Sequence, residues 1–287
     1  MPPSTDTTTP LVPPSQPTLA RQGSLGDVLA QELATIRVLW RRDLVRFFRE
    51  RTRVIGALLQ PLIFWVVIGS GMSPTFRLSP DSHVGYLEYF FPGVVIMVVL
   101  FTAIFTTMSV IEDRHSGFLQ SVLVAPGSRV AVVLGKCLGA ASVALSQGAM
   151  FLLLAPLAGF HFAQMLWLPL CAGLVLTCLS LCALGFLVAW WLDSTAGYHV
   201  VMSLILLPLW IVSGAMFPAP AGSVLAWIAS ANPLSYAVSA VRRGMYGAAL
   251  PADMLAPGRS VWLEVAVLLA FAVVSTLLAA RVCVRRR

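Results

Sequence analysis

The sequence predicts an all-α membrane protein whose chain crosses the bilayer six times. Hydrophobic residues make up 58% of its 287 positions and charged residues only 11%, whereas soluble domains carry about 25% charged residues. A helix needs about 20 apolar residues to cross the hydrocarbon core of a bilayer. Six runs meet this length, near residues 54–72, 90–111, 130–158, 165–191, 198–217 and 261–280.

Two segments precede the first span. Residues 1–26 are polar and rich in proline, without the basic and apolar regions of a signal peptide, and they predict a disordered cytoplasmic tail. Residues 27–53 predict an amphipathic helix, because apolar side chains such as Leu33 and Trp40 recur every three or four positions while arginines occupy another face. Such a helix can lie in the membrane interface; a cytosolic helix packed against a soluble partner is the alternative. Residues 54–287 form the predicted six-helix transmembrane domain.

The distribution of basic residues predicts the orientation of the chain. With the N-terminus inside, 15 of the 19 Lys and Arg residues lie on the cytoplasmic side and four lie outside. By the positive-inside rule, both termini are expected in the cytoplasm. Because the basic residues flank hydrophobic runs, they indicate membrane topology, and no nucleic-acid partner is expected.

The external segment 218–250 predicts two short helices that dip into the outer leaflet and return. Asn232 is a favourable N-cap, and Pro233 stands at the first helical position. A re-entrant segment needs protein or water to satisfy its backbone, and simple surface helices are the alternative. Arg242 and Arg243 near its end either attract an anionic head group or anchor to outer-leaflet phosphates.

The predicted spans lack the groups that ion-coupled transport or catalysis would use. No carboxylate lies at mid-depth, although such transport usually needs ionisable groups inside the membrane. Ser146 and Gln147 in the third span either line a pathway or form hydrogen bonds between helices. Cys178 and Cys182 share a helix face, but buried free cysteine usually behaves as a small apolar residue. We therefore expect no catalytic or metal site in this chain.

The loop between the second and third spans holds the densest mixed-charge cluster of the chain. Residues 111–129 read IEDRHSGFLQSVLVAPGSR. After the charged residues come Gly117 and a short segment in which Phe118 and Leu119 begin one apolar helical face, and Pro126 ends the segment. From periodicity alone, this segment is either a helix that docks into a groove of a soluble protein or a connector on the membrane surface.

Three motifs, in this order, resemble those of the type 2 ATP-binding-cassette (ABC) exporter permeases. FFPGVV, from Phe90, resembles the start of the second span in that family, and ANPLSYAVSAVRRGMYG resembles the segment before its last span. The loop resembles the cytoplasmic loop of the family, although Gln120 stands where an acidic residue is frequent. The resemblance covers about residues 28–287, and the loop fits the family pattern at Glu112, Arg114, Gly117, Leu123, Pro126, Ser128 and Arg129.

This resemblance implies a permease subunit that is not itself an enzyme and binds no cofactor. Two copies, most simply a homodimer, would pair with two copies of a separate ABC ATPase that binds ATP and Mg. Glu112 and Asp113 would pair with basic groups of the ATPase, and Phe118 and Leu119 would enter its cleft. The full set of residues expected to dock the ATPase is Glu112, Asp113, Arg114, Gly117, Phe118, Leu119, Pro126 and Arg129.

The resemblance also implies a bacterial inner membrane location and a cargo class. Family members export drugs, lipids, lipo-oligosaccharides or polysaccharides. Short external loops fit a small amphiphilic cargo (a drug, a lipid or a lipid-linked saccharide) better than a long polymer, because no large external domain is present to capture one. The alternative function is an ATPase-independent channel or facilitator, which would transport its substrate in vesicles that contain this chain alone.

Overall fold

The computed structural model describes residues 25–76, 84–124, 127–218, 222–251, 254–255 and 259–285, and all regular structure within them is helical. Six of these helices are long and apolar enough to cross a membrane, which confirms the predicted number of spans. They are α2 (Arg51–Met72), α3 (Tyr86–Thr107) with its continuation α4 (Ser109–His115), α6 (Arg129–Leu152), α7 (Trp167–Trp191), α8 (Thr195–Trp210) with the π-turn η3 (Ile211–Ala215), and α11 (Val261–Arg285).

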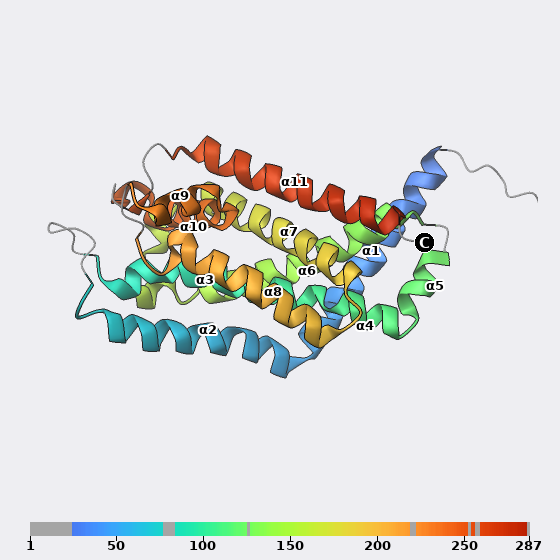
Figure 1. Ribbon diagram of the computed structural model, residues 1–287, viewed down its shortest axis with the longest axis horizontal. Coiled ribbons are helices and arrows are strands. Elements are labelled where there is room, and N and C mark those ends of the chain that lie inside the picture. Colours follow the sequence, from blue (N-terminus) through green and yellow to red (C-terminus); the bar gives the residue numbers. More distant parts are fainter. Residues whose placement is uncertain are drawn as a thin grey trace, which may run out of the picture.

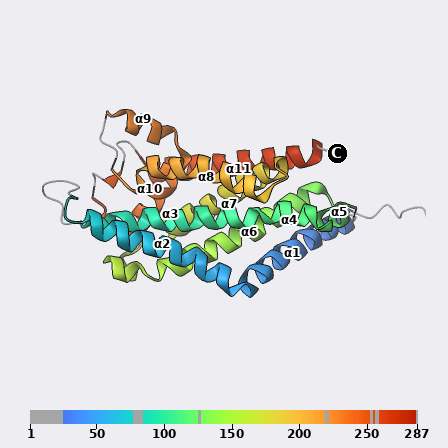
Figure 2. The ribbon, with the colours of Figure 1, turned by 60° about the horizontal axis from the view of Figure 1, so that its bottom comes forward.

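The spans run side by side along the long axis of the molecule, and the shorter helices gather at its two ends (Figures 1 and 2). α1 (Leu25–Arg49), α4 and α5 (Phe118–Val124) lie at one end together with the end of α11. α9 (Val224–Ala231) and α10 (Pro233–Tyr246) lie at the opposite end. The loop after the second span and the segment before the last span are therefore at opposite ends of the bundle.

The second span is the centre of the bundle. In the most apolar window of each span, 83% of the residues of α3–α4 are buried, against 17% for α2 and 22% for α8. α2, α6 and α7 all pack on α3, and α11 packs on α7 (Figure 2). α2 and α8 nevertheless keep broad apolar faces open.

The first two helices meet at a bend. α1 ends at Arg49, and α2 begins at Arg51 after Glu50, whose backbone is not helical. The predicted amphipathic helix extends to residue 53, whereas in the structure residues 51–53 belong to α2. The predicted tail falls on residues 1–26, of which 1–24 lie outside the described part of the chain.

Short polar side chains start several of the helices. The side chains of Ser128, Ser194 and Ser223 accept hydrogen bonds from backbone N–H groups at the starts of α6, α8 and α9, and Asn232 does the same for α10. Capping satisfies donors that a helix N-terminus would otherwise leave open. The third span ends at Leu152, earlier than predicted, and the chain continues through the 3₁₀ turns η1 (Ala155–Ala158) and η2 (Phe162–Gln164).

The segment between the fifth and sixth spans forms the predicted bent helix pair. α9 and α10 meet at an angle of 88° across Asn232, and the 3₁₀ turn η4 (Gly247–Ala249) follows. Pro233 occupies the first turn of α10, where a missing N–H costs nothing. This pair has the geometry of a re-entrant segment.

Candidate functional site: the junction of α1 with the loop after the second span

Asp113 is the centre of a charged cluster that joins three helices. The residue is only 1% exposed, and both oxygens of its carboxylate accept hydrogen bonds from the guanidinium of Arg42 on α1, at 2.8 and 2.7 Å. The ammonium of Lys136 on α6 donates to the same carboxylate. Two-pronged bonds between arginine and a carboxylate are among the strongest polar contacts in proteins, so Asp113 ties α4 to both α1 and α6.

Lys136 is a buried cation with two anionic partners. Only 2% of the residue is exposed, and its Nζ also lies 3.0 Å from Oδ1 of Asp43 on α1. Burial raises the pKa of the Asp43 carboxyl, and the nearby ammonium of Lys136 opposes that shift. A buried charge is tolerated when it is paired and hydrogen-bonded, and here the pairing is between helices far apart in the sequence.

The cluster is electrically balanced. A further ion pair joins Arg46 of α1 to Glu112 of α4 at 2.8 Å. Both of these side chains are about one-third exposed, and an exposed pair contributes only about 0–1 kcal/mol. The strength of the junction therefore resides in the buried contacts of Asp113. In this cluster, the side chains joined by ion pairs of 3.5 Å or less are three cations and three anions, Arg42, Arg46, Lys136, Asp43, Glu112 and Asp113.

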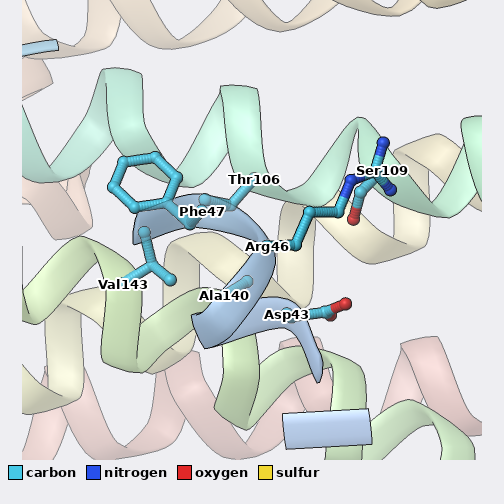
Figure 3. A pocket seen from close by; sticks show the side chains of 7 residues that line it. All are labelled: Asp43, Arg46, Phe47, Thr106, Ser109, Ala140 and Val143. Carbon is cyan, nitrogen blue, oxygen red and sulfur yellow. The ribbon is translucent and has the colours of Figure 1, made fainter. Parts of the chain in front are cut away.

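A small cavity lies inside this junction (Figure 3). Its volume is about 20 Å³, enough for one water molecule. Asp43, Arg46 and Phe47 of α1 line one side, and Thr106 and Ser109 of the second span line another. The remaining wall is formed by Ala140 and Val143 of α6.

Arg114 binds the C-terminal end of α7, the fourth span. Its guanidinium donates to the backbone carbonyls of Ala189, Trp190 and Leu192 at the C-terminus of α7, and it lies 3.4 Å from the carboxylate of Asp193. The last carbonyls of a helix have no partner within the helix and attract cations. Arg114 therefore connects the loop to α7.

The loop helix α5 packs two of its predicted docking residues against its own chain. Gly117 has a φ of +74°, a conformation that favours glycine and separates α4 from α5. Phe118 is half-buried beneath Arg42, whose guanidinium carbon lies 3.7 Å from the ring centroid. Leu119 is 1% exposed within the hydrophobic core. The face that points away from the bundle carries Gln120, Ser121 and Val124, the last of these 88% exposed.

The end of the loop is held by α1 and α11. The backbone N–H and the hydroxyl of Ser128 both donate to the carboxylate of Glu32 on α1, at 2.9 and 2.5 Å. Arg129 donates to the carbonyls of Cys283 and Val284 near the end of α11. Pro126, another predicted docking residue, lies outside the described residues.

At the opposite end, the predicted external residues support the bent helix pair. Asn232 accepts from the N–H of Leu234 at 3.0 Å and donates to the carbonyl of Leu209 at 2.6 Å, which ties α10 to α8. Arg242 is buried, and it donates to the carbonyls of Gly214 and Met254 at 2.8 and 3.2 Å.

Both external arginines are engaged within the chain. The guanidinium carbon of Arg242 lies 4.1 Å from the ring centroid of Tyr89. Arg243 contacts both carboxylate oxygens of Glu264 at 3.2 Å, and that carboxylate is itself buried. Neither arginine presents a free guanidinium to an anionic head group in this structure.

The two polar residues of the third span differ in their surroundings. The hydroxyl of Ser146 donates to the carbonyl of Val143 at 2.7 Å, within its own helix. Gln147 is fully buried, and both polar atoms of its amide are without a hydrogen-bond partner among the described residues. Gln147 therefore does not form the hydrogen bond between helices that was one of its two predicted roles.

Sequence reasoning missed the residues that complete the charged cluster. Arg42 belongs to the arginine face of the predicted amphipathic helix, and neither Asp43 nor Lys136 was singled out as a site residue. Two signals were available in the sequence: an acidic residue inside an arginine-rich helix, and the chain's only lysine. Within the described part of the chain, no three His, Cys, Asp or Glu side chains are grouped closely enough to hold a metal ion.

Comparison with known proteins agrees with this geometry. The family model described as ABC-2 type transporter matches residues 34–246. The daunorubicin resistance ABC transporter permease protein DrrB1 of Streptomyces coeruleorubidus is 29% identical, covering 75% of this chain and 76% of that protein. Putative transport permease ycf38 of Cyanophora paradoxa is 26% identical over 71% and 72% of the two chains. Nodulation protein J of Rhizobium leguminosarum bv. viciae is 24% identical over 73% and 81%.

These matches confirm the resemblance inferred from the three sequence motifs. The family model covers the charged loop, the bent helix pair and five of the six spans. In this family the ATPase is a separate subunit, so the hydrolytic site lies outside this chain. The chain belongs to the ABC-2 type transporter family, as a six-span membrane permease subunit.

Proposed function

We propose that this chain forms the translocation path of an ATP-driven exporter for small amphiphiles. Two copies of the chain pair with two copies of an ABC ATPase in a bacterial inner membrane, with both termini in the cytoplasm. The observation that carries the proposal is the balanced charge cluster, which fixes the loop after the second span to α1 and α6, together with Arg114, which fixes it to α7. A loop held by three helices can transmit a movement of a soluble partner to the bundle.

The ATPase docks on the outward face of the α1–α5 junction. Glu112, Asp113, Arg114 and Leu119 make contacts within the chain, so their role is to hold α5 in position. Gln120, Ser121 and Val124 on the outward face of α5 supply the contact surface. Exposed apolar residues on α1, including Leu29 and Leu33, extend this surface. Affinity comes chiefly from such apolar anchors, because exposed charge pairs contribute little.

The cargo is a drug, a lipid or a lipid-linked saccharide of modest size. A relative that covers most of this chain is named for daunorubicin resistance, which supports a compact amphiphile. The broad apolar faces of α2 and α8 support pairing of two copies around a shared path. In these two helices a smaller share of the most apolar window is buried within the chain than in any other span.

The test of docking uses a matched pair of exposed valines. Val124 lies on the outward face of α5, and Val284 is exposed near the end of α11. Val124→Glu places a charge in the proposed contact, whereas Val284→Glu places the same charge outside it. Each tagged variant is gently extracted from the native membrane, and native mass spectrometry measures its assembly.

The wild type and Val284→Glu are expected to give two copies of the chain with two copies of an ATP-binding subunit. That subunit is identified by its mass and by ATP hydrolysis. Val124→Glu is expected to lose the subunit while the permease keeps its thermal stability. Equal recovery with both variants would contradict the docking surface. ATP-independent transport by vesicles that contain the chain alone would favour a facilitator.

A further inference from the structure

A second, larger cavity lies where α1 bends into α2, beside the cytoplasmic half of α3. Its volume is about 290 Å³, at the lower end of the roughly 300–1,000 Å³ that small-molecule sites occupy. The lining residues come from three helices: Phe47, Gly56, Ala57, Gln60, Thr102 and Phe105. None of these side chains is ionisable.

Small residues on α2 open this cavity. A Cβ added to Gly56 would meet no atom within 4 Å, and Ala57 follows it in the lining. Phe47 and Phe105 contribute aromatic rings from α1 and α3. The space thus has flat apolar walls and is open enough at Gly56 that a larger side chain there would fill it.

One polar group of the lining lacks a partner. Thr102 is 1% exposed, and its hydroxyl forms no hydrogen bond to the described residues. The neighbouring hydroxyls of Thr106 and Thr107 donate to backbone carbonyls one turn earlier, at 2.7 and 2.5 Å. A buried hydroxyl is usually satisfied, so the open hydrogen-bonding capacity of Thr102 points to a ligand group in the cavity. The amide of Gln60 lines the same space.

Phe47 separates this neutral cavity from the charge cluster. The same ring lines the small cavity that holds Asp43 and Arg46 (Figure 3). The ionised groups line the small cavity, and the unpartnered hydroxyl belongs to a residue that lines the larger one. The larger cavity suits an uncharged hydrogen-bonding group attached to an apolar body.

We propose that this cavity is an amphiphile-binding site on the cytoplasmic side of the path. A hydroxyl, ether or carbonyl group of a compact neutral amphiphile contacts Thr102 and Gln60, and its apolar part lies between Phe47 and Phe105. The inference rests on the proposed function, because it locates a site for the transported cargo class. A bilayer phospholipid has the same chemistry, and the experiment separates the two sources.

The experiment is photolabelling of the full chain in vesicles of phosphatidylcholine and phosphatidylglycerol. One probe is an alkyl glucoside with a diazirine in its chain, and the other is phosphatidylcholine with the same diazirine in an acyl chain. Labelled peptides are mapped by mass spectrometry. Gly56→Leu fills the cavity, and Thr102→Val removes the hydroxyl while keeping the shape. Gly71→Leu is the matched control, because Gly71 is also an exposed α2 glycine with open space at its Cβ.

The glucoside is expected to label residues 56–60 and 102–105 saturably in the wild type and in Gly71→Leu. Gly56→Leu should reduce that labelling by at least about tenfold, as expected for a filled site, and Thr102→Val should raise the half-saturating concentration roughly threefold to tenfold, the value of one hydrogen bond. Unsaturable labelling, or unchanged labelling of Gly56→Leu, would overturn the site. Phospholipid labelling that the glucoside does not displace would assign the cavity to bilayer lipid and also overturn it.

Failure of this site and failure of the proposed function give different results. Photolabelling needs neither an ATPase nor ATP, so labelling that persists without ATP-driven transport would retain the site and refute the exporter. ATP-driven export by the assembled complex with no labelling at these peptides would retain the exporter and refute the site.

Discussion

The guanidinium of Arg42 and the carboxylate of Asp113 form a two-pronged ion pair between residues 71 positions apart, and the second oxygen of that carboxylate also accepts from Lys136. Asp113 thus links α4 to both α1 and α6. Its loss would leave Lys136 buried with only Asp43 as a partner. The effects of substitution at this position are therefore expected to exceed those at its neighbour Glu112.

Asp113→Asn is expected to destabilise the protein by about 3–5 kcal/mol, the range for breaking a buried ion pair. The double variant Asp113→Asn, Lys136→Met should recover part of this loss, because it removes the stranded cation as well. Glu112→Gln is the control, with an expected loss of no more than about 1 kcal/mol because its pair with Arg46 is partly exposed. Chemical unfolding in detergent micelles measures all three, and equal losses at 112 and 113 would refute this ranking.

The pKa of Asp43 predicts a pH dependence. Burial raises this pKa above its ordinary value of 3.8, although Lys136 opposes the shift. The folded state then binds more protons than the unfolded state, so the stability contributed by Asp43 is fully present below pH 3.8 and falls as pH rises through the raised pKa. Arg42, Lys136 and Asp113 are the charged groups that face it.

Thermal unfolding of the wild type and of Asp43→Asn between pH 4 and pH 7 tests this sign. The melting temperature of the wild type relative to Asp43→Asn is expected to decrease as pH rises. A difference that grows with pH would mean that the pairing with Lys136 outweighs burial.

Gly93→Ala should destabilise the contact between the second and fifth spans. A Cβ at Gly93 would lie 2.7 Å from the carbonyl oxygen and 2.8 Å from the Cβ of Ala215, closer than van der Waals contact allows. The expected loss is about 1–3 kcal/mol, typical of an overpacked core. Gly71→Ala is the control, since its added Cβ meets open space, and thermal unfolding compares the two variants. Equal stability would show that Ala215 can move aside.

Arg242→Lys should loosen the outer end of the bundle although the positive charge is retained. The arginine bridges the carbonyls of Gly214 and Met254 and stacks on Tyr89, a planar arrangement that an ammonium does not reproduce. We expect faster hydrogen exchange at η3 and at the start of α3, measured by mass spectrometry. Unchanged exchange there, with Arg243→Lys as the comparison, would remove this role from Arg242.

The six spans and the bent helix pair could be predicted because their signals are local. Hydrophobic length identifies a span, and Asn232 followed by Pro233 identifies a helix start, without knowledge of what packs against either. The charge cluster depends instead on which helices become neighbours. Glu112 and Asp113 are adjacent in the sequence and both acidic, yet one is buried between Arg42 and Lys136 and the other is partly exposed. Nothing in the local pattern distinguishes them.

The same limit applies to the loop helix. The apolar periodicity of α5 indicated a face that packs, but it did not indicate whether that face packs on a partner or on this chain. The structure places Leu119 in the core and Phe118 beneath Arg42. The outward face consequently carries Gln120, Ser121 and Val124.

The non-helical residue Glu50 divides the first part of the chain into a bound arm and a loosely held arm. Two ion pairs fix α1 to the loop and a third fixes it to α6, whereas the apolar window of α2 is only 17% buried. We expect a torque applied to α5 to turn α1, α4 and α6 together and to meet least resistance beyond the bend. Residue 50 would then be the hinge, with the first span as the arm that moves relative to the second span.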